Sequence, residues 1–271
     1  MSIESAERVR VEIRAGVAYV TMVRAEKYNG LDWAMVNGLI GAAKRISEDR
    51  AVRAVILSGE GKAFSTGLDF KAFGQTPDLL KRGFVELDGR TTNLFQEVAW
   101  CWRRLPVPVI AVLHGRCYGG ALQIALAADF RFATPDCEFS IMEIKWGLIP
   151  DMTGAVTLRE LIGIDHAKEL TMTGRLFSGT EAKTLKLVTD VAADPLAAAE
   201  ALAAQIKTRS PDAVAAAKAL FDTTWNAGEA EVLATERRVQ AELLFSASQT
   251  EALQANFQKR EPTFGPRRFG G

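Results

Sequence analysis

The chain opens with short apolar runs in which every second residue is polar or charged, a period of two that predicts β-strands. Between these runs, apolar residues recur every three or four positions, which predicts helices, and Asp32 stands where the N-cap of the first helix belongs. Glycines at 83 and 89 should interrupt the second helix. The alternation predicts strands over 9–13 and 17–23, mostly apolar runs predict short buried strands over 52–57 and 109–113, and the helices are predicted over 33–48, 76–104 and 120–128.

Near Pro135 the pattern changes. Two short strand-like pieces around Phe130 and Phe139 are followed, from Thr153 onward, by an almost entirely helical sequence. It includes alanine-rich helices over 197–204 and 213–219, and a helical stretch from about 230 to 258 that should break near Ser246. Strands early and helices late indicate an α/β fold with added C-terminal helices. We therefore predict a core over 1–200 and a C-terminal helical region over 201–271.

Composition narrows the classes of protein. The 271 residues are 48% hydrophobic, enough for a sizeable core, and 33 Lys and Arg balance 33 Asp and Glu. Such balance argues against a nucleic-acid or membrane partner, and no apolar run reaches the ~20 residues that cross a bilayer. The N-terminus does not resemble a signal peptide, and the three cysteines lack CxxC spacing, which predicts reduced thiols in a cytoplasmic protein. Two histidines make a His-rich metal site a poor interpretation.

Two glycine-containing segments could present backbone N–H groups to a ligand. FSTGLD, over 64–69, reads as an ordinary loop or as a turn that exposes the N–H of Leu68. HGRCYGGA, over 114–121, places Gly119 and Gly120 at a helix N-terminus, where free N–H groups suit an anion or a developing oxyanion. Neither matches GxGxxG or GxxxxGK, so dinucleotide binding and a P-loop are disfavoured.

A third segment, EIKWGLIPD over 143–151, carries two carboxylates in apolar surroundings. Glu143 and Asp151 are eight residues apart, and spacing alone favours two ordinary surface acids at the edges of a loop. The alternative is a pair held in an apolar pocket, where burial raises a carboxyl pKa and suits it to general acid–base catalysis.

The order of these three segments resembles the crotonase superfamily, the enoyl-CoA hydratase/isomerase family. The resemblance covers nearly the whole chain, from EKYNGL over 26–31 through VRAVILSGEGKAF over 52–64 to KREPTF over 259–264. It implies a right-handed spiral of ββα units, with C-terminal helices that pack around a threefold axis in homotrimers or dimers of trimers.

The resemblance also implies an acyl-CoA substrate whose enolate-like form is held between the N–H groups of Leu68 and Gly120. No metal, flavin or nicotinamide cofactor is expected, since coenzyme A belongs to the substrate. Each lysine among the expected CoA contacts could equally be a solvated surface residue, and each aromatic residue among the expected acyl-pocket residues could be plain core. The expected CoA contacts are Lys62, Ala63, Asp69, Lys71 and Lys259, and the acyl-pocket candidates are Phe84, Phe95, Trp100 and Trp102.

The acid–base residues depart from the hydratase pattern. A typical hydratase of the family holds one water with two glutamates; Glu143 matches the second, but the first falls at Gln123, whose amide cannot transfer a proton. Asp151 matches an acid of the dienoyl-CoA isomerases. The resemblance therefore favours double-bond isomerisation by Glu143 and Asp151, with Gln123 as an auxiliary residue that orients water or substrate. Hydration of a 2-enoyl-CoA is the alternative, and an acyl-CoA-binding protein with weak catalysis is the second alternative.

Overall fold

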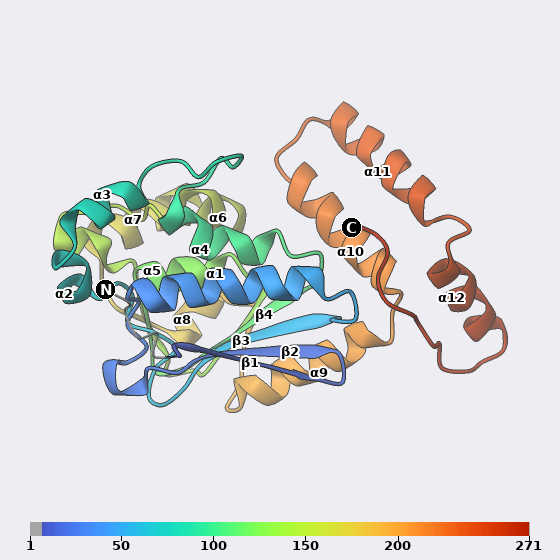
Figure 1. The fold of residues 1–271 in the computed structure, drawn as a ribbon, viewed down its shortest axis with the longest axis horizontal. Helices are drawn as coiled ribbons and strands as arrows, with labels where there is room; N and C mark the ends of the chain where they lie inside the picture. The colour runs from blue at the N-terminus through green and yellow to red at the C-terminus, as the bar shows by residue number, and fades with distance from the viewer. Residues whose placement is uncertain (1–6, 271) are drawn as a thin grey trace.

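The computed structural model describes residues 7–270, whose strands form two sheets (Figure 1). The larger sheet has the order β1-β2-β3-β4-β6-β9, and all its neighbours are parallel except the β1–β2 hairpin. The smaller sheet has the order β5-β7-β8. The strands are β1 (Val9–Arg14), β2 (Val17–Met22), β3 (Ala54–Gly59), β4 (Val109–Leu113), β5 (Arg116–Tyr118), β6 (Phe130–Ala133), β7 (Glu138–Ser140), β8 (Phe177–Ser178) and β9 (Asp190–Val191).

Helices follow most of the strands, as a parallel sheet requires. The first half of the chain contains η1 (Ala25–Lys27), α1 (Trp33–Glu48), α2 (Phe70–Gly74), α3 (Pro77–Gly83), α4 (Leu94–Arg103) and α5 (Gly120–Leu126). The second half contains η2 (Met142–Trp146), α6 (Gly154–Leu161), α7 (Ile164–Thr173), α8 (Gly179–Thr184), α9 (Pro195–Lys207), α10 (Pro211–Thr224), α11 (Glu229–Leu243) and α12 (Ala247–Phe257).

Helices cover both faces of the larger sheet (Figure 1). On one face α1, α4 and α5 pack over the main core, and on the other α9 contacts β3, β4 and β6. Two buried alanines of α9, Ala199 and Ala203, lie against Ile56 and Ile110 of the central strands. Central parallel strands are buried on both sides, which explains why β4 is an unbroken apolar run rather than an alternating one.

Most of the predicted elements are confirmed, and the main omissions are short strands. Asp32 does cap α1, because its carboxylate accepts from the N–H of Met35 at 2.8 Å, and the predicted break near Ser246 separates α11 from α12. The predicted interruption of the helical stretch over 76–104 around Gly83 and Gly89 is confirmed too, since α3 ends at Gly83 and α4 starts only after Asn93. The short strands β8 and β9 were not predicted, because two residues are too few to show a period.

The C-terminal helices α10, α11 and α12 extend away from the sheet, at the right of Figure 1. The predicted boundary at residue 200 lies inside α9, which is continuous and packs on the sheet, so a division of the chain there stays a prediction. Asp212 of α10 fixes the C-terminal segment, because its carboxylate accepts from Ser248 at 2.6 Å and from the N–H of Phe269 at 2.8 Å. Within residues 7–270, no helix is both long and apolar enough to cross a membrane.

Candidate active site

The FSTGLD loop is fixed to its neighbours by buried polar contacts. Asn29, which is fully buried, donates from Nδ2 to the carbonyl oxygens of Ala63 at 2.9 Å and Phe64 at 3.1 Å. Ser65 forms an isolated bridge to β5, and its hydroxyl donates to the carbonyl of Asn29 at 2.7 Å. Buried polar groups that are fully paired favour one conformation. The loop is thereby held beside the turn that leads into α5.

Two backbone N–H groups on these adjoining segments are free. Within residues 7–270, the N–H groups of Leu68 and Gly120 donate no hydrogen bond. Gly67 adopts φ +82°, and a Cβ there would stand 2.7 Å from the carbonyl oxygen of Tyr118 and 3.4 Å from the nitrogen of Gly120. Glycine is therefore required for this close approach. The structure brings the two predicted donors onto segments that touch.

Glu143 lies in η2 beside the same turn and is only 8% exposed. Its Oε1 accepts from Nε2 of Gln123 at 2.6 Å, whereas its Oε2 is buried without a partner among the described residues. The carboxylate lies against Gly119, where a Cβ would stand 3.4 Å from Oε1. Burial raises the pKa of Glu143, and repulsion from Asp151 adds to this, while the hydrogen bond from Gln123 opposes it.

Asp151 is half-buried, and burial raises its pKa as well. Across the part of the chain that the structure describes, no cation forms an ion pair with Glu143 or Asp151. The interpretation as two ordinary surface acids is therefore wrong for Glu143. A raised pKa means that a carboxyl group holds a proton more readily than an ordinary acid does, which suits both groups to proton transfer.

Gln123 is 2% exposed and faces these two acids from α5. Besides donating to Glu143, it accepts at Oε1 from the N–H groups of Met152 at 2.7 Å and Gly154 at 2.9 Å. These partners fix which end of the carboxamide is oxygen. The side chain thus contacts the protein's own groups on both sides, rather than presenting an unpaired acceptor to a ligand.

Two of the expected CoA contacts have structural partners in this chain. Ala63 is fully buried. Asp69 caps α2 by accepting from Ala72, and it forms an ion pair with the buried Arg24 at 2.9 Å. Burial would raise the pKa of Asp69, but the hydrogen bonds from Ala72 and Arg24 outweigh it and lower the pKa. Arg24 also donates to the carbonyl of Gly30 at 2.9 Å, so its guanidinium connects the end of the FSTGLD loop to the segment at Gly30.

The three lysines expected to contact CoA are exposed. Lys62 lies two residues before the FSTGLD loop, and Lys71 lies in the first turn of α2. Lys259 follows α12, whereas α2 lies at the opposite end of the molecule (Figure 1). One chain alone therefore does not bring Lys259 together with the other two.

Some residues around the site were not predicted. Phe70 and Trp146, which carry part of their rings to the surface, pack with centroids 4.7 Å apart and join the FSTGLD loop to η2. In the sequence, only their positions, directly after Asp69 and inside EIKWGLIPD, could have indicated that these two residues lie near the site. Of the acyl-pocket candidates, Trp102 and Phe95 are buried in the main core.

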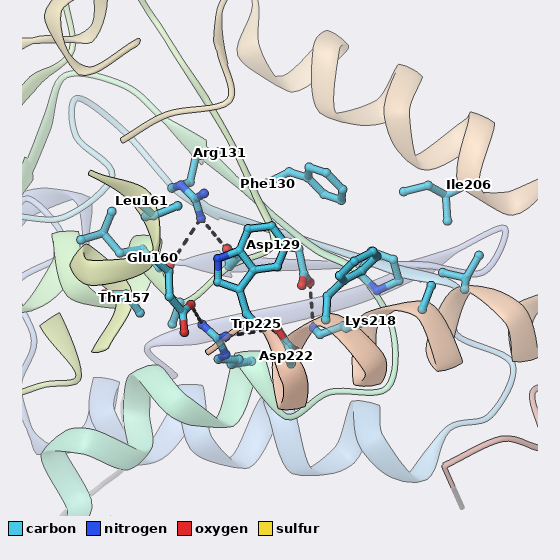
Figure 2. Close-up of a pocket in the computed structure, with 18 residues that line it drawn as sticks. Asp129, Phe130, Arg131, Thr157, Glu160, Leu161, Ile206, Lys218, Asp222 and Trp225 are labelled. Carbon is cyan, nitrogen blue, oxygen red and sulfur yellow. Dashed lines mark hydrogen bonds and ion pairs between the residues drawn. The ribbon is translucent and has the colours of Figure 1, made fainter. Parts of the chain in front are cut away.

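A separate cavity of about 590 Å³ lies between α10 and the core (Figure 2), and we call it the α10 cavity. None of the predicted catalytic residues lines it. Its carboxylates are paired with cations: Asp129 with Lys218 at 2.7 Å, and Glu160 with Arg103 at 2.6 Å. Burial raises the pKa of Asp222 to about 6, although nearby cations oppose the shift. The cavity is lined by Arg103, Pro108, Leu126, Ala127, Ala128, Asp129, Phe130, Arg131, Thr157, Glu160, Leu161, Ile206, Val214, Ala217, Lys218, Phe221, Asp222 and Trp225.

Within residues 7–270, a sheet flanked by helices thus carries two free N–H groups on touching segments, beside a buried carboxylate that has no cationic partner. The enoyl-CoA hydratase/isomerase family model matches residues 12–267, and the chain belongs to this family, with the crotonase fold. The chain is thus an enzyme of the hydratase/isomerase family.

Individual relatives are similar over nearly their full length. YngF of Bacillus subtilis, assigned by name to the enoyl-CoA hydratases/isomerases, is 34% identical over 92% of this chain and 94% of its own. The mouse mitochondrial enoyl-CoA hydratase domain-containing protein 2 is 31% identical over 92% of this chain and 84% of its own. A crystal structure of enoyl-CoA hydratase from Bacillus anthracis has a TM-score of 0.86 and 28% identity, covering 95% of this chain and 98% of that one.

Proposed function

We propose that the enzyme shifts a double bond in an acyl-CoA thioester by transferring protons with Glu143 and Asp151. The observation that carries the proposal is a pair of carboxyl groups with raised pKa values and no cation beside them. A carboxylate that nothing neutralises is costly to bury, and it becomes a stronger base for the same reason. Such a pair can remove a proton at one carbon and deliver one at another.

The roles follow from position. Glu143 lies against Gly119, next to the N–H of Gly120, so it is the candidate for the proton on the carbon beside the thioester. The N–H groups of Leu68 and Gly120 would hold the thioester oxygen as negative charge develops there. Asp151 would then exchange the proton farther along the acyl chain. Atoms balance, because one C–H bond breaks, another forms, and the double bond moves without addition of water.

Hydration of a 2-enoyl-CoA is the second candidate, and the names of relatives such as the mouse enoyl-CoA hydratase domain-containing protein 2 favour it. Addition of water needs a group that accepts a proton from the water and one that holds it in place. Glu143 can be the acceptor, and either Asp151 or Gln123 would position the water. Gln123 is the weaker choice, because its oxygen already accepts from Met152 and Gly154. A binding protein with weak catalysis is the remaining alternative, and the uncompensated burial of Glu143 argues against it.

A panel of 2-enoyl-, 3-enoyl- and 3,5-dienoyl-CoA thioesters with products identified by mass spectrometry tests the proposal. We expect isomers of unchanged mass from 3-enoyl or 3,5-dienoyl substrates. A product 18 Da heavier from 2-enoyl-CoA, formed faster than any isomer, would establish hydration instead. No product from any thioester, with binding intact, would leave the binding-protein alternative.

We further propose that the enzyme works as a homotrimer or a dimer of trimers. The helices α11 and α12, together with the loop that joins them, expose large apolar side chains, which a monomer would leave in water. A second copy could also bring Lys259 toward the CoA phosphates held near Lys62 and Lys71. Sedimentation equilibrium tests this assembly. The exposed side chains are Leu233, Leu244, Phe245, Leu253 and Phe257.

A further inference from the structure

Every polar atom of the Gln123 side chain is tied to a part of the proposed catalytic site. Nε2 donates to one oxygen of Glu143, and Oε1 accepts from the backbone of Met152 and Gly154. The approach is tight, because a Cβ on Gly154 would stand 2.8 Å from Oε1 of Gln123. One amide thus connects Glu143 to the turn that begins at Asp151.

The other oxygen of Glu143 is the informative one. Oε2 is buried and accepts no hydrogen bond within residues 7–270, and unsatisfied buried oxygens are rare in proteins. Since Gln123 occupies Oε1, the two oxygens are no longer equivalent. A carboxylate held by one oxygen keeps its other oxygen at a fixed place with a free lone pair.

We propose that Gln123 is a positioning residue that makes Oε2 of Glu143 the single oxygen that exchanges protons with substrate. This rests on the proposed function of Glu143. The hydrogen bond from Nε2 stabilises the ionised carboxylate and so offsets part of the cost of burial. Through its oxygen, the same amide fixes the turn of Asp151 relative to Glu143.

Through Met152, Gln123 is also connected to the proposed oxyanion site. Met152, whose N–H bonds to Gln123, packs against Gly120, where a Cβ would stand 2.6 Å from the Met152 sulfur. A shift of the amide would therefore displace the turn and the segment that carries the Gly120 N–H. A positioning role predicts that substitutions at 123 change the ionisation of Glu143 and not only the stability of the fold.

Gln123→Glu isolates that effect, because it keeps the oxygen that accepts from Met152 and Gly154 but removes the donor to Glu143. Two carboxyl groups this close share one proton. Two backbone N–H donors stabilise negative charge at position 123, so the shared proton resides on Glu143 and blocks it as a base. We expect the rising limb of the pH–rate profile to move at least one pH unit upward, a tenfold or larger loss of rate at fixed pH on that limb.

The measurement is exchange of the α-proton of a saturated acyl-CoA in deuterated water, followed by NMR between pH 4 and 9. Gln123→Met is similar in size but forms no hydrogen bonds, so it should also move the rising limb of the pH–rate profile to higher pH. It should lower the melting temperature as well, because two N–H groups lose their acceptor. KM for the thioester should stay within about threefold in Gln123→Glu, since this variant keeps the oxygen that holds the Met152 turn and so leaves the proposed donors of Leu68 and Gly120 in place.

Thr157→Val is the matched control. Thr157 is a buried neighbour on α6 whose hydroxyl bonds only to the carbonyls of Thr153 and Gly154, so its loss should change stability without moving the limb. If the limb stays in place in Gln123→Glu, or moves equally in Thr157→Val, the positioning role is wrong. If the wild-type enzyme shows no exchange at any pH, the proposed function itself fails, which is a different result.

Discussion

The candidate active site and the α10 cavity both bury carboxylates, but they differ in whether a cation lies beside the carboxylate. In the α10 cavity, Asp129 and Glu160 each lie within 2.7 Å of a cationic nitrogen (Figure 2). In the candidate active site, Oε1 of Glu143 accepts a hydrogen bond from the Gln123 amide instead. Its Oε2 has no partner among the described residues. A paired buried charge holds elements together, whereas an unpaired one is unstable until something brings it a proton. The comparison separates acids that hold elements together from the acid that we propose transfers protons.

Glu97 of α4 extends the comparison to the main core. It is 1% exposed, more buried than Glu143, yet Arg90 and Arg104 both pair with it and the Thr92 hydroxyl donates to it at 2.7 Å. Depth of burial alone therefore does not identify a catalytic carboxylate. What distinguishes Glu143 is the absence of a cationic partner within the described residues.

Removing the charge of Glu143 should have the largest effect on catalysis. We expect Glu143→Gln to lower kcat about 10²- to 10⁴-fold, the usual contribution of a general base, while the Kd of a saturated acyl-CoA changes less than about threefold. Stopped assays for double-bond movement and calorimetric titration measure the two quantities. Glu97→Gln provides the contrast: it should lower stability and leave kcat per folded molecule unchanged.

Asp151→Asn should show whether the two acids act at different carbons. Because Asp151 is the candidate for the distant carbon, we expect double-bond movement to fall about 100-fold while α-proton exchange persists within about threefold. Both are followed by NMR in deuterated water. Loss of exchange together with isomerisation would mean that the two carboxyl groups act on the same proton.

Breaking an ion pair in the α10 cavity should lower the stability of the fold and leave catalysis unchanged. Arg103→Met removes the cation from Glu160 and Asp222, and we expect the free energy of unfolding to drop by about 3 kcal/mol, because buried carboxylates lose their partner. Urea unfolding measures this, and kcat should not change. Arg238→Met, which removes a fully exposed helical pair with Glu242, should cost less than about 0.5 kcal/mol.

Asp222→Asn should have a smaller effect on stability than Arg103→Met, and one that depends on pH. Its pKa of about 6 in the fold lies above the ordinary 3.8, so the folded state disfavours its ionised form. Stability linked to this group is therefore present at low pH and is lost as pH rises from about 4 to 6. Partial exposure to solvent reduces the effect, and we expect Asp222→Asn to gain about 1 kcal/mol at pH 7.5 and nothing at pH 4. An equal gain at both pH values would contradict the assignment.

The sequence predicted the fold better than the site. A period of three to four located α1, and an unbroken apolar run located β4, because the core that they face extends over many residues. The same patterns could not show that Asn29 and Arg24 fasten the FSTGLD loop, since both are polar residues in a polar stretch. Nor could they pair Gln123 with Glu143, because that contact joins positions twenty residues apart across two elements.

The free N–H groups of Leu68 and Gly120 have a consequence for how such an enzyme can diversify. A backbone donor is encoded by no particular side chain, so the residue at 68 is open to change while the glycine at 67, held at φ +82°, is not. The part that would stabilise charge can be inherited intact as the residues at 123, 143 and 151 are exchanged one at a time. Each exchange would alter where protons go, and a new reaction could arise without a new fold.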